Sequence, residues 1–404
     1  MLNDLPNIKH AEVNGKKVLL RVDFNVPFDK NTGIITDETR IKKSIPTIEY
    51  LLNNGASVIL ISHMGRPNGK KDEQFSLVKV IDIIKKYIKQ DIIFCEETTG
   101  EKAKSMAENL KSSEVLLLEN IRFKAEETSK NKEERESLAK ELSELGDIYV
   151  DDAFGCCHRE HASIVELAEL LPSYAGFLLH REIEMLDKVL TKPERPFVVV
   201  IGGSKVSTKI KLLETFVTKV DTILVGGAMA YTILKARLLE IGSSLIEREF
   251  LSNAFQLVDK ASYHKCQFVL PEDHIIADEF SENAKIKKTG KEIPAGWMGM
   301  DIGPKTADKY EKIIKEAKTV LWNGPMGVFE MSKFDKGTMA VAKAVAKCKG
   351  ITIAGGGDSY YAAKKAGIED KITHLSTGGG AMLEYIEGKK LPGIQVLLSG
   401  KENE

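Results

Sequence analysis

The chain has 404 residues, more than the roughly 250–300 at which a single hydrophobic core stops growing, so we expect two domains. Hydrophobic residues make up 43% of the sequence and charged residues 29%, which is ordinary for a globular protein. The net charge of −1 argues against a general binder of nucleic acids or membrane surfaces, so an anion site must concentrate positive charge locally.

Cysteine usage and hydropathy predict a cytoplasmic protein. The five cysteines are odd in number and lack C-x-x-C spacing, so reduced thiols are the simplest interpretation. No segment approaches ~18 uninterrupted apolar residues. The first residues contain no cationic stretch followed by an apolar run, so we expect neither an export signal nor a membrane-spanning helix.

Four short apolar strands are predicted in the first half, each followed by polar residues. The first begins at Val18 and leads to Asp23 and Asn25, and the others cover 58–62, 115–118 and 148–150. Helical patterns lie between them, as in 36–54 and 77–88. This alternation predicts a parallel sheet, in which ligands bind beyond the carboxyl ends of the strands.

Cationic side chains follow these predicted strands. Arg66, Arg122, Arg159 and His63 lie in strand-end loops, and Arg40 lies at the start of the first helix. For any one arginine a surface salt bridge is the simpler explanation. For the set, a site for a small, multiply charged anion explains the pattern better, because guanidinium groups suit carboxylate and phosphate.

Two features allow a second interpretation. Cys156, Cys157 and His158 with His161 could be drawn as a metal site, but adjacent cysteines do not readily ligate one tetrahedral ion, so we disfavour it. The charged run 124–141 is most simply a solvated helix face.

A helical pattern over 174–190 is followed by Pro193 and Pro196. A helix that ends in two prolines just before a new buried strand is typical of a domain boundary.

The second half begins with the strand Phe197–Ile201, the turn Gly202–Gly203 and a predicted helix from Ser204 that would place Lys205 and Lys209 on one face. Backbone N–H groups, a helix dipole and two ammonium groups indicate a phosphate site. Further strand–glycine units cover 221–227, 319–327, 350–359 and 372–380. Asp358 is the natural Mg²⁺ ligand among them.

These patterns favour phosphoryl transfer between an anion-binding domain and a nucleotide-binding domain that close during the reaction. A dinucleotide-dependent dehydrogenase is an alternative, which the absence of G-x-G-x-x-G disfavours. A non-catalytic two-lobed binding protein is another, which the lack of an export signal and the nucleotide-type glycine turns disfavour.

The motifs of the chain, taken in their order, are specific to one protein family. The chain resembles phosphoglycerate kinases from near residue 5 to about 395. The resemblance is carried, in this order, by Arg21–Pro27 (RVDFNVP), Ser62–Pro67 (SHMGRP), Leu118–Phe123 (LENIRF), Asp152–Gly155 (DAFG), His158–His161 (HREH), Gly202–Lys209 (GGSKVSTK), Gly296–Asp301 (GWMGMD), Trp322–Glu330 (WNGPMGVFE), Gly355–Asp358 (GGGD) and Ser376–Gly380 (STGGG).

The resemblance implies an α/β protein of two Rossmann-like three-layer α/β/α domains with parallel sheets, joined by a hinge helix. It implies a 3-phosphoglycerate-binding domain over 1–173, completed by the tail 391–404. The hinge helix would cover 174–192 and the nucleotide-binding domain 193–390. The family also implies a monomer.

Site residues follow position by position from the same resemblance. The 3-phosphoglycerate site would use Asp23, Phe24, Asn25, Arg40, His63, Met64, Gly65, Arg66, Arg122 and Arg159. The nucleotide site would use Lys209, Gly299, Asn323, Pro325, Glu330, Gly356, Gly357, Asp358 and Ser359, with Asp358 near Mg²⁺ and Glu330 at the ribose. Arg40, Lys205, Lys209, Gly378 and Gly379 would surround the transferred phosphoryl group.

The implied reaction is ATP + 3-phosphoglycerate = ADP + 1,3-bisphosphoglycerate, with these small molecules as the partners. The acceptor carboxylate is already ionised at neutral pH, so no catalytic base is needed. Thr208 lies where some family members carry Asp, which changes only a local charge near the nucleotide. Cys156 and Cys157 occupy positions where the family has small residues, which further disfavours a metal site there.

Overall fold

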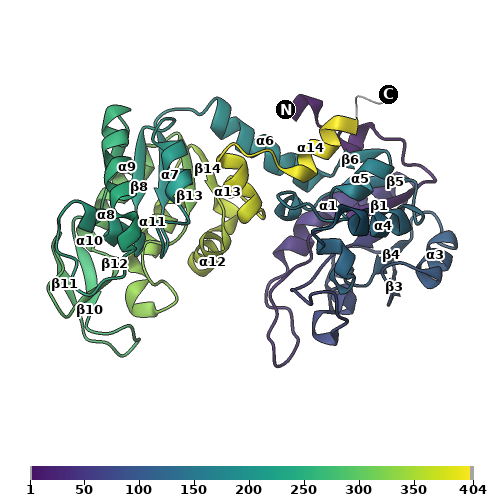
Figure 1. Cartoon of the computed structure of the whole chain (residues 1–404), viewed down its shortest axis with the longest axis horizontal. Coiled ribbons are helices and arrows are strands. Elements are labelled where there is room, and N and C mark those ends of the chain that lie inside the picture. The colour runs from purple at the N-terminus through teal and green to yellow at the C-terminus, as the bar shows by residue number, and fades with distance from the viewer. Residues whose placement is uncertain (1, 401–404) are drawn as a thin grey trace. The chain divides into compact units, whose positions relative to one another are not determined.

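In this computed structural model, which describes residues 2–400, the chain forms two compact units (Figure 1). The first unit runs to Glu184 and takes up the chain again at Lys389, and the second is Met185–Gly388. The boundary between the units along the chain therefore falls within helix α6 (Phe177–Thr191), which lies inside the predicted connector 174–192.

Six parallel strands form the sheet of the first unit, in the order β3-β4-β2-β1-β5-β6. The register around the central strand β1 is shown by Leu19, which pairs with Ile59 of β2 on one side and with Tyr149 of β5 on the other. The strands are β1 (Lys17–Arg21), β2 (Ser57–Ile61), β3 (Ile92–Cys95), β4 (Val115–Leu118), β5 (Ile148–Asp151) and β6 (Ser173–Ala175).

The helices of the first unit pack on this sheet through alternate strand residues. Val18 and Leu20 of β1 point to one face and share a hydrophobic core with Ile41, Ile45 and Ile48 of α1. Alternate residues of a strand share one face of the sheet, and helix residues three or four apart share one face of the helix, so the two apolar faces pack together. The helices are α1 (Thr39–Asn53), α2 (Ile81–Ile84), α3 (Glu101–Glu108), α4 (Lys132–Ser143), α5 (Glu166–Leu170) and α14 (Pro392–Ser399), with the first part of α6.

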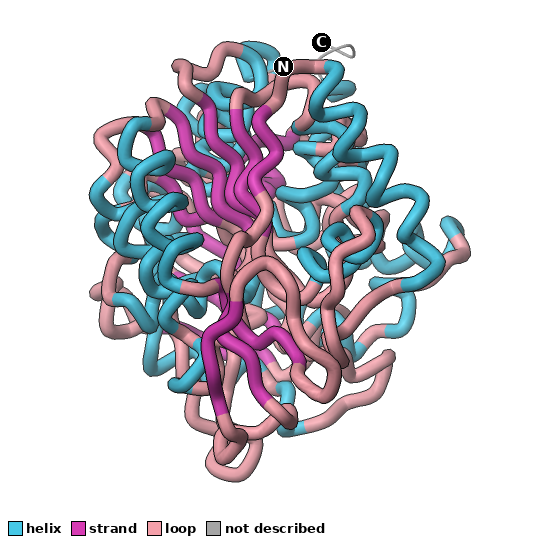
Figure 2. Tube along the Cα trace, turned by 90° about the vertical axis from the view of Figure 1, so that its left-hand side faces the viewer, coloured by secondary structure: helices cyan, strands magenta, loops and turns pink. Residues whose placement is uncertain are grey.

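The second unit contains a second parallel sheet, in the order β15-β14-β13-β7-β8-β9. Figure 2 shows helices on both sides of these strands, which is the three-layer arrangement that the family resemblance implied. The strands are β7 (Phe197–Ile201), β8 (Thr222–Val225), β9 (Gln267–Val269), β13 (Thr319–Asn323), β14 (Ile351–Ala354) and β15 (His374–Leu375).

The helices of this unit are α7 (Ile210–Phe216), α8 (Met229–Ala236), α9 (Leu251–Tyr263), α10 (Pro304–Glu316), α11 (Lys336–Lys347), α12 (Gly357–Ala366) and α13 (Gly380–Ile386). A small antiparallel sheet, in the order β11-β10-β12, was not predicted. It consists of β10 (His274–Ala277), β11 (Ile286–Thr289) and β12 (Met298–Ile302).

The helix predicted from Ser204 was wrong in its start, because α7 begins only at Ile210. The carboxylate of Glu247 accepts hydrogen bonds from the backbone N–H and the hydroxyl of Ser207, at 2.9 and 2.5 Å, and this holds the segment in a turn. Lys205 and Lys209 therefore do not share a helix face. The pattern 77–88 likewise forms a short 3-10 helix followed by only one turn of α2.

Asp152 caps the N-terminus of α6. Its Oδ1 accepts hydrogen bonds from the backbone N–H of Leu178 at 2.8 Å and of Leu179 at 3.1 Å. A Cβ on Gly176 would lie 2.3 Å from this oxygen, so only glycine leaves room for the cap. The loop after β5 is thus joined directly to the start of α6.

Substituting Asp152 with asparagine is expected to change how stability depends on pH. Burial raises the pKa of Asp152 to about 7. An aspartate in the unfolded chain has a pKa of about 3.9, so the folded state binds the carboxyl proton more tightly than the unfolded chain does. Ionisation therefore opposes folding as the pH rises from about 4 to about 7. Since the amide oxygen of asparagine can still cap α6, the free energy of unfolding of Asp152→Asn should improve relative to the native protein across this range. Urea unfolding at pH 5 and pH 8 measures the difference, and a pH-independent difference would contradict the expectation.

The end of the chain returns to the first unit. Helix α14 packs on α5 and β6, and the N–H of Gly393 donates to the backbone oxygen of Cys157 at 3.0 Å. All five cysteines are free thiols, and Cys348 is the one that is not buried. Within residues 2–400 no helix is both long and apolar enough to cross a membrane.

Candidate functional site

Four strand ends of the first unit carry side chains predicted to bind the acceptor. Asp23 and Asn25 follow β1, His63–Arg66 follows β2, Arg122 lies in a 3-10 turn after β4, and Arg159 follows β5. Strands β4, β2, β1 and β5 are consecutive and parallel in the sheet. Their carboxyl ends therefore share one edge, where a ligand of such a sheet binds.

Arg40, near the start of α1, is held against the loop after β1. Its Nη1 donates to Asp23 Oδ2 at 2.8 Å and to the backbone oxygen of Asn25 at 3.1 Å. The side-chain oxygen of Asn25 accepts from the N–H of Gly65 at 2.9 Å, which joins the loops after β1 and β2. The Arg40 side chain is 33% exposed, so the guanidinium is accessible to an anion.

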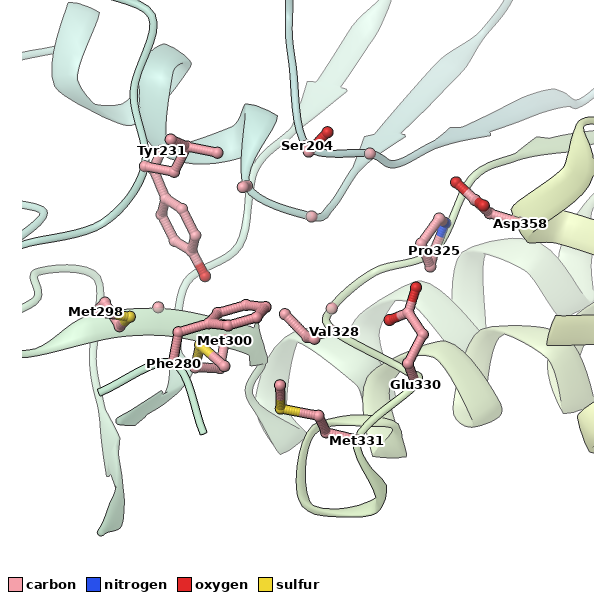
Figure 3. Close-up of a pocket in the computed structure, with 16 residues that line it drawn as sticks. Ser204, Tyr231, Phe280, Met298, Met300, Pro325, Val328, Glu330, Met331 and Asp358 are labelled. Atoms are coloured by element: carbon pink, nitrogen blue, oxygen red, sulfur yellow. The ribbon is translucent and has the colours of Figure 1, made fainter. Parts of the chain in front are cut away.

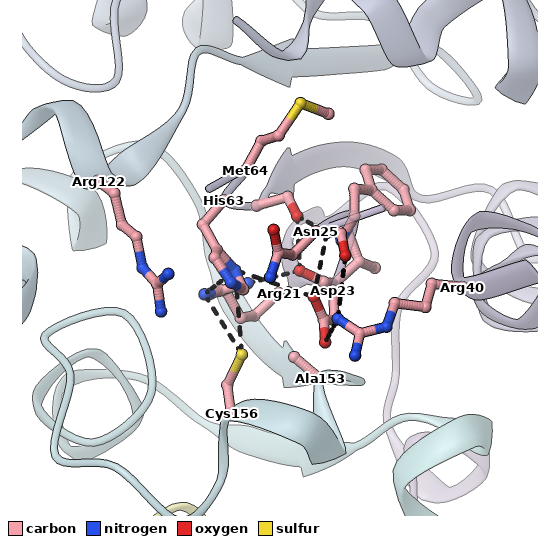
Figure 4. Close-up of polar contacts among 12 residues, drawn as sticks. Arg21, Asp23, Asn25, Arg40, His63, Met64, Arg122, Ala153 and Cys156 are labelled. Atoms are coloured by element: carbon pink, nitrogen blue, oxygen red, sulfur yellow. Dashed lines mark hydrogen bonds and ion pairs between the residues drawn. The ribbon is translucent and has the colours of Figure 1, made fainter. Parts of the chain in front are cut away.

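His63 is buried beside two side chains that the sequence prediction did not assign to the site. Figure 4 shows its ring next to the Arg21 guanidinium and the Cys156 thiol. Arg21 Nη2 lies 3.3 Å from His63 Nδ1 and 3.9 Å from Cys156 Sγ. Burial and the nearby arginines hold the pKa of His63 well below its usual value. His63 is therefore neutral, with Nδ1 accepting from Arg21 and the proton on Nε2.

Arg21 is fully buried and belongs to a network beneath the site. Its Nε donates to Ser163 Oγ at 2.8 Å, and its Nη2 lies 3.8 Å from Glu127 Oε1. Glu127 in turn accepts from the Ser163 hydroxyl at 2.8 Å and lies 3.7 Å from His161 Nδ1. A charged residue at the end of an otherwise apolar strand was the available sequence signal for this network.

Arg122 is positioned by its own loop and by the loop after β2. Its Nη1 donates to the backbone oxygen of Gly65 at 2.7 Å, and its N–H donates to Asn120 Oδ1 at 3.1 Å. Its buried Nε has no hydrogen-bond partner among the described residues. Burial lowers the pKa of Arg122, but a guanidinium still stays charged at neutral pH. The geometry leaves this cation with bonding capacity for a ligand.

The remaining predicted acceptor residues divide into exposed and buried ones. Arg66 and Arg159 are exposed, and neither has a carboxylate partner within residues 2–400. Phe24 and Met64 are fully buried in the hydrophobic core of the first unit. Their side chains therefore support the loops and do not face a ligand, while the backbone N–H of Phe24 donates to Ser62 Oγ at 2.9 Å.

The two adjacent cysteines that could be drawn as a metal site have thiols with different partners. Cys156 Sγ faces Arg21 and His63, whereas Cys157 Sγ donates to Asp151 Oδ2 at 3.4 Å, so the two thiols do not converge. Among the described residues, possible ligand atoms of Asp23, His63 and Cys156 lie within 4.8 Å of one another. The Arg21 guanidinium already bonds to this group, and a fixed cation there opposes binding of a second one.

The second unit contains a pocket of about 660 Å³ at the carboxyl ends of its strands. Four residues predicted to bind the nucleotide line it, namely Gly299, Pro325, Glu330 and Asp358. The other lining residues were not predicted, and they are Gly203, Ser204, Gly227, Ala228, Tyr231, Leu245, Phe280, Met298, Met300, Gly327, Val328 and Met331. A concave site that is mostly apolar, with a few polar groups, is typical of a small-molecule site.

The pocket has two chemically different ends. Figure 3 shows the carboxylates of Glu330 and Asp358 near Pro325 at one end, and Tyr231, Phe280 and the two strand β12 methionines at the other. The apolar end suits a flat aromatic ring. The carboxylate end suits hydroxyl groups and a cation, because carboxylates accept hydrogen bonds and ligate hard metal ions.

Lys209 is held by a hydrogen bond to Asn323 and is not among the residues that line the pocket. Its Nζ donates to Asn323 Oδ1, and Asn323 Nδ2 donates to the backbone oxygen of Gly355 at 2.6 Å. Burial lowers the pKa of Lys209, although Asp358 opposes this shift. The ammonium group is thus fixed between the loops that follow β13 and β14.

Two helices begin at glycine residues predicted to bind phosphate. Gly356, with φ 96°, precedes α12, and Gly379, with φ 47°, precedes α13. Asp358 lies in the first turn of α12, while the buried Ser359 hydroxyl accepts from the N–H of Gly324 at 2.6 Å and so connects two loops. Gly378 donates to Ser376 Oγ at 3.1 Å. Lys205 is exposed in the turn after β7.

Comparison with known proteins agrees with this architecture. The phosphoglycerate kinase family model matches residues 8–389. The phosphoglycerate kinase of Leptospira biflexa serovar Patoc is 52% identical over 399 residues, which cover 98% of this chain and 99% of the relative. That of Borrelia hermsii is 48% identical over 394 residues, covering 97% and 99%. The solved structure of phosphoglycerate kinase from Coxiella burnetii superposes with a TM-score of 0.87 at 38% identity, covering 99% and 100%. This chain therefore belongs to the phosphoglycerate kinase family.

Proposed function

We propose that the described residues divide the family reaction, ATP + 3-phosphoglycerate = ADP + 1,3-bisphosphoglycerate, between the two units. The observation that carries this division is the row of cations at one edge of the first sheet, with Arg66 and Arg159 lacking carboxylate partners within residues 2–400. The second unit supplies the matching half, a pocket with one apolar end and one carboxylate end. Since the two bound substrates must meet, turnover requires the units to close.

In the first unit, Arg66, Arg122 and Arg159 would bind the phosphate and carboxylate of the acceptor through paired N–H donors. Neutral His63 would donate from Nε2, because its Nδ1 is engaged by Arg21. Asp23 and Asn25 would orient the hydroxyl of the acceptor and hold Arg40 in place. The acceptor carboxylate is the nucleophile, so positioning and charge stabilisation are what the protein must provide.

In the second unit, Glu330 would accept from ribose hydroxyl groups at the carboxylate end of the pocket. The start of α12 at Gly356–Ser359 would bind the phosphate chain, since free N–H groups and the helix dipole favour anions. Lys209, fixed on Asn323, would contact the same phosphates. Arg40, Lys205 and the α13 start at Gly378–Gly379 would stabilise the charge that develops on the transferred group.

A metal ion is implied because kinases of this kind act on a nucleotide with its metal. The residues fit Mg²⁺, since exposed Asp358 in the first turn of α12 supplies one carboxylate, and Mg²⁺ prefers one or two carboxylates together with phosphate oxygens and water. When bound, Mg²⁺ would neutralise charge on the phosphate oxygens. We further propose a cytoplasmic monomer, in keeping with five unpaired thiols and glycolytic chemistry.

A coupled assay with ATP, Mg²⁺ and 3-phosphoglycerate tests the activity. ADP production must depend on the acceptor, and a rate no higher than in a reaction without 3-phosphoglycerate would refute the proposal.

Substitutions in the two units are expected to affect different substrates. Arg66→Ala should raise the KM for 3-phosphoglycerate by about tenfold to a hundredfold, because a charge-assisted contact is lost. Glu330→Ala should instead raise the KM for ATP. Steady-state kinetics with each substrate varied in turn makes the comparison, and Arg181→Ala, at an exposed arginine paired with Glu184, provides a control for loss of charge. Equal effects of both variants on both substrates would contradict the division of roles.

A further inference from the structure

One polar side chain lies at the apolar end of the pocket in the second unit. Figure 3 shows the Tyr231 hydroxyl pointing into the cavity, toward Phe280, Met298 and Met300. The residue is only 4% exposed, and its hydroxyl makes no hydrogen bond to any of the described residues. The other side chains that line this end of the pocket, Leu245, Phe280, Met298 and Met300, offer no comparable donor or acceptor.

The position of this hydroxyl is fixed by close packing. A Cβ on Gly299 would lie 2.1 Å from both Cζ and the hydroxyl oxygen of Tyr231, so the tyrosine ring occupies the space that a side chain on β12 would need. The ring also packs against His274, with centroids 5.5 Å apart. Burial raises the pKa of Tyr231, so the hydroxyl stays protonated and can both donate and accept.

A second buried tyrosine in the same unit shows how such a hydroxyl is normally satisfied. Tyr310 donates to the backbone oxygen of Val225 at 2.6 Å and lies 3.1 Å from that of Val269. Buried hydroxyl groups are costly without a partner, and protein interiors usually supply one. The Tyr231 hydroxyl has no such partner in the described chain and opens onto the pocket, where a bound ligand can supply one.

We propose that the Tyr231 hydroxyl hydrogen-bonds to the edge of the purine base of the bound nucleotide and so selects for the base. This inference rests on the proposed nucleotide site and adds a specificity-determining residue to it. An apolar surface holds a flat ring without fixing its orientation, whereas a hydrogen bond to one rigid hydroxyl favours a single orientation of the base. A ligand without a matching polar edge leaves this hydroxyl unpaired, and that penalty is the source of selectivity.

Tyr231→Phe removes the hydroxyl and leaves the ring against Gly299. Calorimetric titration with ADP and with ribose 5-diphosphate, which lacks the base, separates base recognition from phosphate binding. ADP should bind about three- to tenfold more weakly to Tyr231→Phe than to the native protein, as expected for one neutral hydrogen bond. Ribose 5-diphosphate should bind both proteins equally, which also verifies that the variant is folded.

Tyr310→Phe is the matched control, because it removes a buried, hydrogen-bonded hydroxyl of the same unit from a residue that does not line the pocket, and it should leave ADP affinity unchanged. Unchanged ADP affinity in Tyr231→Phe, or an equal loss for ADP and ribose 5-diphosphate, would overturn the proposed role of the hydroxyl. If the native protein itself failed to bind ADP, the proposed nucleotide site would be refuted, and the role of the hydroxyl with it. A failure of the nucleotide site is therefore distinguishable from a failure of the hydroxyl's role alone.

Discussion

Replacing Arg40 with alanine is expected to lower kcat by a factor on the order of 10²–10³ while leaving the dissociation constant of ADP nearly unchanged. Arg40 lies on α1 beside Asp23, at the edge of the sheet where the acceptor is expected to bind. Its guanidinium would contact the phosphoryl group mainly during transfer, so its loss should raise the barrier more than it weakens either ground-state complex. Steady-state kinetics at saturating substrates and calorimetry with ADP measure the two quantities.

Two further variants sharpen this test. Arg40→Lys keeps the charge but not the planar fork of donors, so it should recover only part of the lost rate. Arg181→Ala removes an exposed guanidinium on α6 and should leave kcat unchanged. A kcat for Arg40→Ala within about twofold of the native value would remove this residue from transition-state stabilisation.

Replacing Arg21 with methionine is expected to reduce the free energy of unfolding by about 3–5 kcal/mol. Methionine approximates the length of the side chain but leaves Glu127, which is fully buried, without its nearby cation. Breaking a buried pair in this way is costly because the remaining charge cannot reach water. Urea unfolding followed by circular dichroism measures the loss.

The double variant Arg21→Met with Glu127→Gln tests the cause. Removing the second charge should restore a large part of the stability lost in the single variant, since the uncompensated carboxylate is then gone. A loss below about 1 kcal/mol in Arg21→Met would show that the pair contributes little to folding. An unchanged loss in the double variant would assign the effect to packing instead.

The strands and their cationic ends were predictable because each feature is local in sequence. A short apolar run followed by Arg66, Arg122 or Arg159 needs only the rule that ligands bind at the carboxyl ends of parallel strands. The start of α7 was not predictable in this way. It depends on Glu247, which is remote in sequence and holds Ser207 in a turn.

Other features were hidden for comparable reasons. Strand β6 is only three residues long and begins at Ser173, so it gives no continuous apolar run. The apolar run of β3, Ile92–Cys95, was present in the sequence but was not predicted as a strand. The pocket in the second unit is formed by residues from several distant segments, and no single window of sequence contains the combination of Tyr231, Gly299 and Glu330. Family motifs gave individual residues such as Gly299, but not the tyrosine ring that explains why glycine occurs there.

The return of α14 to the first unit has a consequence for biosynthesis. Since Met185–Gly388 is one uninterrupted stretch, the second unit is in effect an insertion into the first. Every contact within the inserted unit is available once residue 388 has left the ribosome, whereas α5 and β6 still await the helix Pro392–Ser399 that packs on them. The part of the protein whose synthesis starts first is therefore the part whose folding is completed last.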